Sequence, residues 1–192
     1  VRWTDLAWAA GLYGFVVVGF RSWYSAPLLD PAAFRGYYGQ GVYAHRVLGR
    51  EVALALQRAL GDPLGEHLVL GGQRPLAGGM ATAVLLLDGI SLLAVVALSG
   101  RLLARRSVPE PARTLVQVVL VVVLVASLST LTPYDLPAAA LVLGALSAAD
   151  ARPPWDLAAI PLVALGVATR ESALVAVGAL LAVLVVERVA LD

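Results

Sequence analysis

Long runs of apolar residues, separated by short polar segments, dominate the chain. An apolar run that approaches or exceeds about 18 residues is typical of a helix that crosses a membrane. Even the valine-rich run is predicted to be helical, because a lone strand in lipid would leave its backbone unpaired. The pattern predicts a single all-α membrane domain, a polytopic bundle whose first span is a retained helix rather than a signal peptide. The six predicted spans are residues 4–20, 76–104, 113–132, 135–150, 156–169 and 171–189.

One long polar region, residues 21–75, separates the first two predicted spans. Its first half is rich in turn formers and tyrosine, whereas residues 42–60 have an apolar side and an arginine-bearing side and end before Gly61. This second segment carries too many charges for a span, so we expect an interfacial amphipathic helix within a large outer loop. A helix packed against the bundle would show the same pattern, and both interpretations stay open.

Two of the predicted spans are unusually short. Residues 136–149 and 157–168 cover only about 18–21 Å at ~1.5 Å per residue, less than the ~30 Å hydrocarbon core. The ends of such helices are stable at membrane depth only where protein or a wet cavity covers them. We therefore expect this half of the bundle to form the wall of a cavity.

The composition supports the membrane class and excludes several chemistries. The 192 residues are 60% hydrophobic and 14% charged, with a mean hydropathy of +0.84. There is no cysteine, which excludes disulfides, thiolate chemistry and cysteine metal sites. The two histidines, His45 and His67, are too far apart in sequence to form a helical pair of ligands. We expect no metal, no cofactor and no nucleic-acid partner.

The arginines set the predicted orientation. Residues 101–113 hold four arginines against one glutamate, and an excess of positive charge marks cytoplasmic loops. We therefore place this loop and both termini in the cytoplasm, in a cell membrane of the bacterial inner-membrane type. The region 21–75 then lies outside, together with Tyr134-Asp135 and Arg170-Glu171.

Asp88 lies in the middle of the predicted span 76–104. A central aspartate costs about 2.5–3.5 kcal/mol on insertion, and each neighbouring Leu, Ile or Val offsets ~0.3–0.6 kcal/mol of it. The helix is still expected to insert, with Asp88 facing protein or water rather than lipid. A proton or substrate contact and a hydrogen bond to a neighbouring helix are both open as its role.

Polar and aromatic side chains gather on the predicted outer face. Arginine can hold a phosphate through two parallel hydrogen bonds, tyrosine can stack on a sugar or prenyl unit, and a carboxylate can act as general base. Such a set suits an anionic, lipid-linked substrate. Structural roles are open too: Asp30 as a turn former, Asp135 as a helix cap, and Arg170 with Glu171 as an ion pair. The candidate residues are Asp30, Tyr37, Tyr38, His45, Arg46, Asp135, Arg170 and Glu171.

Three motifs carry a family resemblance: Arg-Leu-Leu-Ala-Arg-Arg at 101–106, Leu-Thr-Pro-Tyr-Asp-Leu-Pro at 131–137 and Ala-Thr-Arg-Glu-Ser-Ala-Leu at 168–174. Across about residues 85–186 the chain resembles the polytopic GT-C type membrane glycosyltransferases, roughly the first half of such a protein. The resemblance implies sugar transfer from a polyprenyl-phosphate donor at the outer membrane face, with Asp30 as catalytic base and Asp135 as the second acidic position. Members of the family usually have more helices, and many carry paired acids where Asp30 stands alone.

Two other functions fit the same sequence. A non-catalytic transmembrane subunit would use its helices to pack against a larger membrane complex. A small transporter would use Asp88 and the interrupted helices. Whether the chain is an enzyme stays open, and the expected partners are a membrane lipid, a polyprenyl-phosphate sugar and other membrane proteins.

Overall fold

Every regular element in the described part of the chain is helical. The computed structural model describes residues 2–19, 30–41, 44, 46–64, 79–126, 134–151 and 154–170. The all-α prediction is confirmed for these residues. The elements are α1 (Trp3–Gly19), α2 (Pro31–Tyr38), α3 (Val47–Leu60), α4 (Ala81–Arg105), α5 (Glu110–Ala126), α6 (Asp135–Ala149), the 3-10 turn η5 (Trp155–Ala158) and α7 (Ala159–Thr169).

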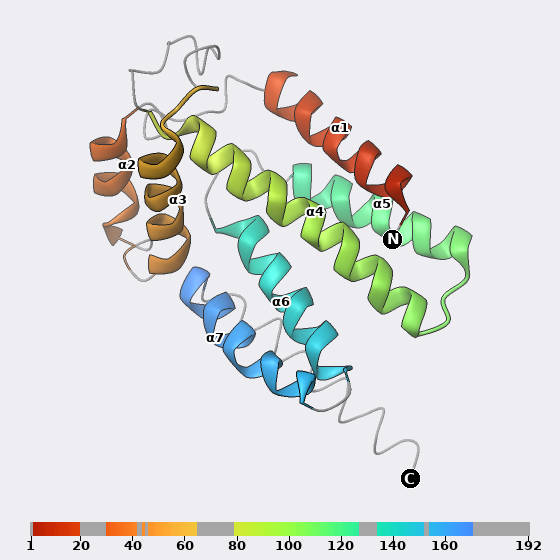
Figure 1. Ribbon diagram of the computed structural model, residues 1–192. Helices are drawn as coiled ribbons and strands as arrows, with labels where there is room; N and C mark the ends of the chain where they lie inside the picture. The colour runs from red at the N-terminus through yellow and green to blue at the C-terminus, as the bar shows by residue number, and fades with distance from the viewer. Residues whose placement is uncertain are drawn as a thin grey trace.

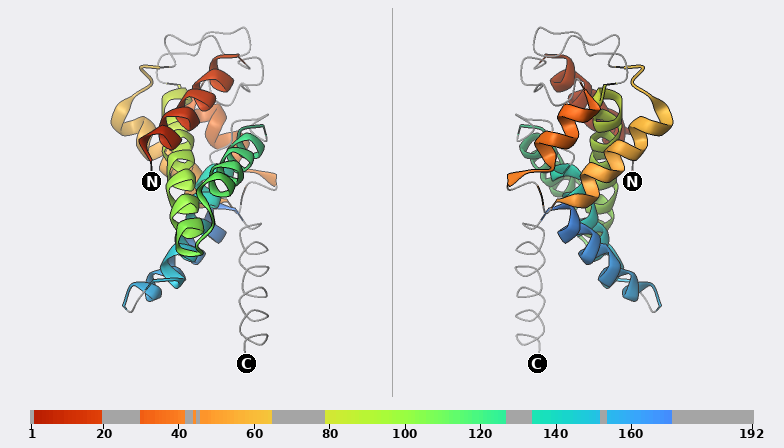
Figure 2. Two further views of the ribbon diagram at one scale, coloured as in Figure 1. Left: turned by 90° about the vertical axis from the view of Figure 1, so that its right-hand side faces the viewer. Right: turned by 90° about the vertical axis from the view of Figure 1, so that its left-hand side faces the viewer.

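The central helix is α4, and α1, α3, α5 and α6 all pack against it (Figure 1). Its buried positions recur at helical spacing, for example Leu85, Leu92 and Val96. The long helices alternate in direction along the chain, and α6 and α7 form an antiparallel pair (Figure 1). The side views in Figure 2 show α2 and α3 around the upper part of α4, whereas α6 and α7 reach its lower end.

Small residues allow the helices to approach α4 closely. A Cβ atom added to Gly89 would lie 3.4 Å from Cε1 of Tyr13 on α1. The Tyr13 hydroxyl donates a hydrogen bond of 3.0 Å to the Leu85 carbonyl, which ties the same two helices together. On the other side of α4, a Cβ atom at Gly144 of α6 would lie 3.9 Å from Leu98 of α4. Such small-residue contacts are typical of helix packing in membranes.

Helix α3 packs against α4 and α7 and buries Gly49, Ala53 and Leu54. Contact with the bundle was one of the two interpretations of residues 42–60. The helix begins at Val47, five residues later than predicted. It also contacts α2, and Leu60 at its end is exposed.

Helix α2 was not predicted from the sequence. The turn-rich interpretation of this stretch is wrong from Pro31 to Tyr38. The Asp30 carboxylate accepts a 2.9 Å hydrogen bond from the backbone N–H of Ala33, and Pro31 occupies the first turn. An aspartate cap followed by proline is a known helix-start signal, so the sequence did contain the information.

One helix of the described residues, α4, is long and apolar enough to cross a membrane by length and composition. Helices α1 and α5 have 17 residues each, and α6 and α7 are shorter apolar helices. The predicted span 171–189 falls on residues that the structure does not describe. The buried core helix of a soluble protein can match α4 in length and apolarity, so α4 alone does not establish six spans.

We expect Gly89→Val to weaken the packing of α1 on α4, because the added γ-carbons would overlap the Tyr13 ring. Overpacking of this kind typically costs about 1–3 kcal/mol. The thermal unfolding midpoint of the purified chain in detergent measures the effect. The matched control is Gly11→Val on α1, since a Cβ atom there has nothing within 4 Å. Equal midpoints for the two variants would show that the Gly89 contact does not limit the packing.

Candidate functional site

An ion pair between Asp135 and Arg170 joins the start of α6 to the end of α7. The two helices are antiparallel, so the first residue of α6 lies beside the residue that follows α7 (Figure 1). Arg170 is held at this point by its backbone N–H, which donates to the Gly166 carbonyl over 2.9 Å. The predicted cap role of Asp135 is wrong: Tyr134 occupies the cap position, without a side-chain cap bond. The predicted ion-pair partner of Arg170, Glu171, is not among the described residues.

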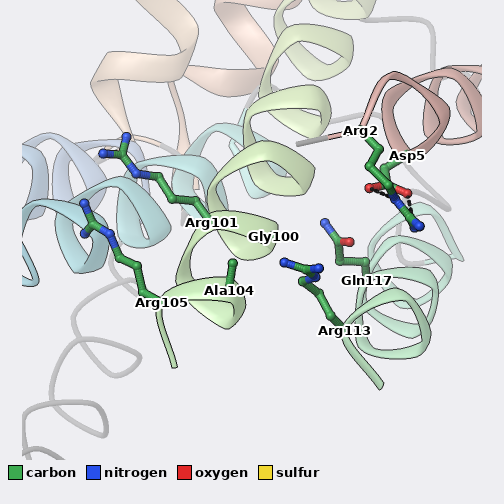
Figure 3. Close-up of a pocket in the computed structure, with 8 residues that line it drawn as sticks. All are labelled: Arg2, Asp5, Gly100, Arg101, Ala104, Arg105, Arg113 and Gln117. Atoms are coloured by element: carbon green, nitrogen blue, oxygen red, sulfur yellow. Dashed lines mark hydrogen bonds and ion pairs between the residues drawn. The ribbon is translucent and has the colours of Figure 1, made fainter. Parts of the chain in front are cut away.

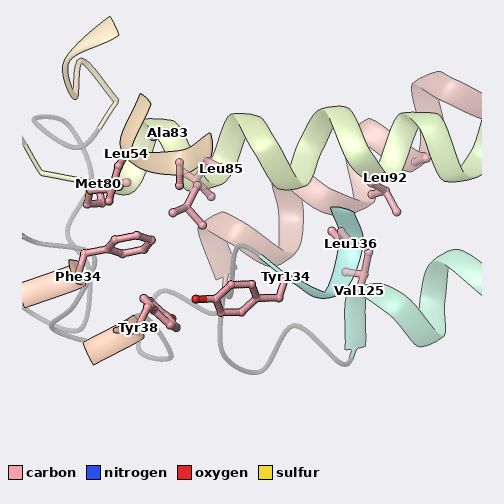
Figure 4. Close-up of a cluster of buried hydrophobic side chains, with 14 of the residues drawn as sticks. Phe34, Tyr38, Leu54, Met80, Ala83, Leu85, Leu92, Val125, Tyr134 and Leu136 are labelled. Carbon is pink, nitrogen blue, oxygen red and sulfur yellow. The ribbon is translucent and has the colours of Figure 1, made fainter. Parts of the chain in front are cut away.

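Aromatic side chains extend the site from α6 to α2. The ring centroids of Tyr38 and Tyr134 lie 5.4 Å apart, with an interplanar angle of 76°. The centroids of Phe34 and Tyr38 lie 4.7 Å apart. All three side chains are fully buried, and the Tyr134 hydroxyl points toward α2 in Figure 4. Edge and tilted contacts of this type contribute about 0.5–1.5 kcal/mol each beyond area burial, so they fix α2 to the start of α6.

Two arginines from the start of α3 complete the arrangement. The guanidinium carbon of Arg46 lies 5.7 Å from the centroid of the Tyr134 ring, within the range of a cation–π contact. Nη1 of Arg50 donates a 3.2 Å hydrogen bond to the Tyr38 carbonyl, which holds α2 against α3. We name the set Tyr38, Arg46, Tyr134, Asp135 and Arg170 the arginine–tyrosine site.

Four of the eight predicted candidates meet in this site: Tyr38, Arg46, Asp135 and Arg170. Tyr37 lies at its border, half-exposed, with its ring centroid 4.9 Å from that of Tyr38. His45 and Glu171 are not among the described residues.

Three contributing residues were not among the predicted candidates: Phe34, Arg50 and Tyr134. Tyr134 directly precedes Asp135 in the motif at 131–137, and this position could have marked it as a candidate. Phe34 and Tyr38 are four residues apart, so they share a helix face. That relation was hidden because α2 was not predicted.

Asp30 lies away from the arginine–tyrosine site. It caps the first turn of α2, whereas Tyr38 is at the last turn, about 12 Å further along at ~1.5 Å per residue. Among the described residues it has no hydrogen bond or ion pair with Asp135 or Arg170. The observed role of Asp30 is helix capping, and its role as a base stays a prediction.

Asp88 is fully buried in the middle of α4. Neither carboxylate oxygen has a hydrogen bond within the described part of the chain. Its neighbours on the helical wheel are Gly89, which faces α1, and Leu98, which faces α6. At ~3.6 residues per turn they lie about 100° and 80° to either side of it. Asp88 therefore points between these helices. Its predicted burial is confirmed. Of its two open roles, a hydrogen bond to a neighbouring helix is not found within the described ranges.

The arginine–tyrosine site has the groups that an anion with an attached sugar or lipid requires. Guanidinium groups of Arg46 and Arg170 are donors without acceptor capacity, and a phosphate matches their fork geometry. Asp135 supplies a carboxylate in contact with one of them. Comparison with known proteins finds no family model, no curated protein and no solved structure that matches the chain.

We expect Asp88→Val to raise the thermal unfolding midpoint of the chain. The substitution removes a buried carboxyl group that has no hydrogen-bond partner in the described part of the chain, and burial of such a polar group costs about 1–3 kcal/mol in mutational data. Asp88→Asn is the control, because it keeps the shape and polarity and should leave the midpoint near that of the wild type. A lower midpoint for Asp88→Val would mean that the carboxyl group has a stabilising partner.

Proposed function

We propose that the chain is a polytopic membrane protein of glycosyltransferase type, which binds a polyprenyl-phosphate-linked sugar at the arginine–tyrosine site. The observation that carries the proposal is the meeting of Arg46, Tyr134, Asp135 and Arg170 at one end of the bundle. These residues come from the starts or ends of α3, α6 and α7, so the site exists only in the folded bundle.

The membrane arrangement is part of the proposal. Helix α5 exposes a run of large apolar side chains, among them Leu115, Val119 and Val123, and α4 exposes Ile90 at mid-length. Lipid would cover such side chains, whereas a contiguous apolar surface is rare on a soluble monomer. Helix α3, with arginines and an open surface, would lie at the membrane–water boundary beside α4.

The proposed chemistry places the donor phosphate on Arg170 and Arg46. A carboxylate accepts the proton of the acceptor hydroxyl, the acceptor oxygen attacks the anomeric carbon, and the polyprenyl phosphate leaves with the electron pair of the broken bond. The resemblance assigns the base to Asp30, whereas the geometry favours Asp135. An incoming phosphate competes with Asp135 for the Arg170 guanidinium, and this competition would make the carboxylate available as base.

The second candidate function is a non-catalytic membrane subunit. One observation favours it: both predicted catalytic carboxylates have structural roles, Asp30 as the cap of α2 and Asp135 as the ion-pair partner of Arg170. In this case the arginine–tyrosine site would stabilise the bundle without binding a substrate.

Single cysteines test the proposed topology in this cysteine-free chain. Gln40 and Ser107 are both exposed. Gly39 is unsuitable, because a Cβ atom there would lie 2.6 Å from the Arg35 carbonyl oxygen. With a membrane-impermeant thiol reagent, Gln40→Cys should label on intact cells and Ser107→Cys only after permeabilisation. The unmodified chain is the control. Labelling of both positions from the same side would contradict the six-span arrangement.

Substrate binding and transfer are tested with the full chain in nanodiscs that contain undecaprenyl phosphate, and with a radiolabelled polyprenyl-phosphate hexose. Arg170→Gln should weaken lipid-phosphate binding at least tenfold, because it removes the charged fork. Asp135→Asn should lower sugar transfer by about 10²–10⁴-fold. The control Arg58→Gln changes an exposed arginine on α3 whose one hydrogen bond among the described residues goes to the Leu54 carbonyl, and this variant should affect neither binding nor transfer.

Asp30→Asn separates the two predicted catalytic residues. Asparagine caps a helix as well as aspartate does, so this variant removes the carboxylate without removing the cap. Normal sugar transfer by Asp30→Asn, together with loss of transfer in Asp135→Asn, supports Asp135 as the base. Loss of transfer in Asp30→Asn with normal transfer by Asp135→Asn supports Asp30 instead. If wild type neither binds the lipid phosphate nor transfers sugar, the glycosyltransferase proposal is contradicted and the non-catalytic subunit is favoured.

A further inference from the structure

A second group of charged side chains lies at the other end of the bundle, where α4 ends and α1 and α5 begin. They line a pocket of about 550 Å³ (Figure 3), a volume within the ~300–1,000 Å³ range of small-molecule sites. Four arginines contribute to its lining: Arg2, Arg101, Arg105 and Arg113. This pocket has no part in the proposed sugar transfer, because α4 separates the two ends by about 37 Å at ~1.5 Å per residue.

Arg2 is already neutralised within the protein. Its Nη2 lies 2.9 Å from Oδ1 of Asp5, and a second ion pair joins it to Glu110. The hydrogen bond with Asp5 raises the pKa of Arg2. Nη2 also donates a 2.8 Å hydrogen bond to the Thr114 hydroxyl. These contacts fix the start of α1 to the first turns of α5 and form one wall of the pocket.

The other three arginines have no carboxylate partner within the described residues. Arg105 donates to the backbone carbonyls of Ser147 and Asp150 over 3.2 and 3.4 Å. Arg101 and Arg113 have neither an ion pair nor a hydrogen bond to another described side chain. Even with Glu110 included, the pocket has four arginines and only two carboxylates, Asp5 and Glu110. It therefore carries an excess of positive charge.

The floor of the pocket is a packed contact between α4 and α5. Gln117 is buried, and its Nε2 donates a 2.8 Å hydrogen bond to the Val96 carbonyl. A Cβ atom added to Gly100 would lie 2.7 Å from that Nε2, so a glycine at this position makes room for the glutamine. In Figure 3 the Arg113 side chain lies on the same side of α4 as Gln117, whereas Arg101 and Arg105 extend from the other side of α4. The floor is closely packed, and Arg113 lies beside it.

We propose that this pocket binds a phosphate-bearing anion, with Arg113 as its principal ligand and the positive charge of Arg101, on the other side of α4, adding to the attraction. Guanidinium forks match phosphate geometry and bind it through parallel charged hydrogen bonds. The starts of α1 and α5 add the positive ends of two helix dipoles. In the proposed topology this end faces the cytoplasm, where basic pockets between helices bind anionic lipid headgroups. A phospholipid headgroup and a soluble phosphate ester share the chemistry that the pocket recognises.

The test uses the full chain in nanodiscs of phosphatidylcholine, with two phosphate probes. In one arm, phosphatidylglycerol replaces up to about a fifth of the lipid, and native mass spectrometry counts the retained molecules. In the other arm, glycerol phosphate is titrated into phosphatidylcholine nanodiscs by calorimetry. We expect at least a tenfold loss of apparent affinity in Arg113→Gln and a larger loss in the Arg101→Gln/Arg113→Gln double variant. Arg113→Lys keeps the charge without the fork and should lie between Arg113→Gln and wild type.

Arg58→Gln is the control, because this exposed arginine lies on α3 at the opposite end of the bundle. Arg101→Gln alone provides a second variant in case Arg113→Gln does not fold. Arg101 is exposed and makes no hydrogen bond or ion pair with another described residue, so its replacement should not disturb the fold. Arginine-dependent binding in the lipid arm identifies a headgroup site, and arginine-dependent binding of glycerol phosphate identifies a soluble ester. Equal binding by wild type and the arginine variants in both arms, or no binding at all, would overturn the proposal whatever the outcome of the sugar-transfer assay.

Discussion

The burial of α4 on several sides is the constraint on which the bundle depends. Four helices pack on this single helix, so its surface has to present a different complementary face to each of them. Gly89 and Gly100 leave room for Tyr13 and Gln117, and Leu98 contacts α6. Because the same 25 residues serve all these contacts, a change on one face of α4 is limited by packing on the others.

The two ends of α4 differ in how their charges are balanced. At the Ala81 end, aromatic rings are fully buried and Arg170 is paired with Asp135. A ligand there has to compete with an interaction that already exists. At the Arg105 end, guanidinium groups outnumber carboxylates around an open pocket, and an anion would relieve repulsion between like charges. The first arrangement favours specificity, and the second favours attraction of any anion that fits.

Asp88 lies between these ends without a described hydrogen-bond partner. A buried polar group of this kind reduces stability unless something compensates for it. The helices around Asp88 are held in place by other contacts. Asp135 pairs α6 with the end of α7, Tyr13 bonds α1 to α4, and Arg2 joins the start of α1 to α5. The bundle can therefore tolerate a residue that weakens its own centre.

The sequence by itself determined the helical class and most helix positions in the described residues. Apolar runs predict α4 to α7 because each run reports the local periodicity and environment of its own segment. The same local reasoning missed α2, since eight residues with glycine and tyrosine resemble a turn. A correct interpretation of the Asp30–Pro31 cap would have recovered it.

Only the tertiary structure decided which polar residues meet. The sequence placed Asp135 and Arg170 on one predicted face, but their direct contact depends on the antiparallel packing of α6 and α7. Tyr38 reaches Tyr134 across nearly a hundred residues, and Arg2 reaches Glu110 across a similar distance in the chain. Hydrophobic pattern specifies which face of a helix is buried, and it does not specify the neighbour that covers that face. Those contacts are set by which helices pair, because the side-chain ridges of one helix have to fit the grooves and small residues of the next.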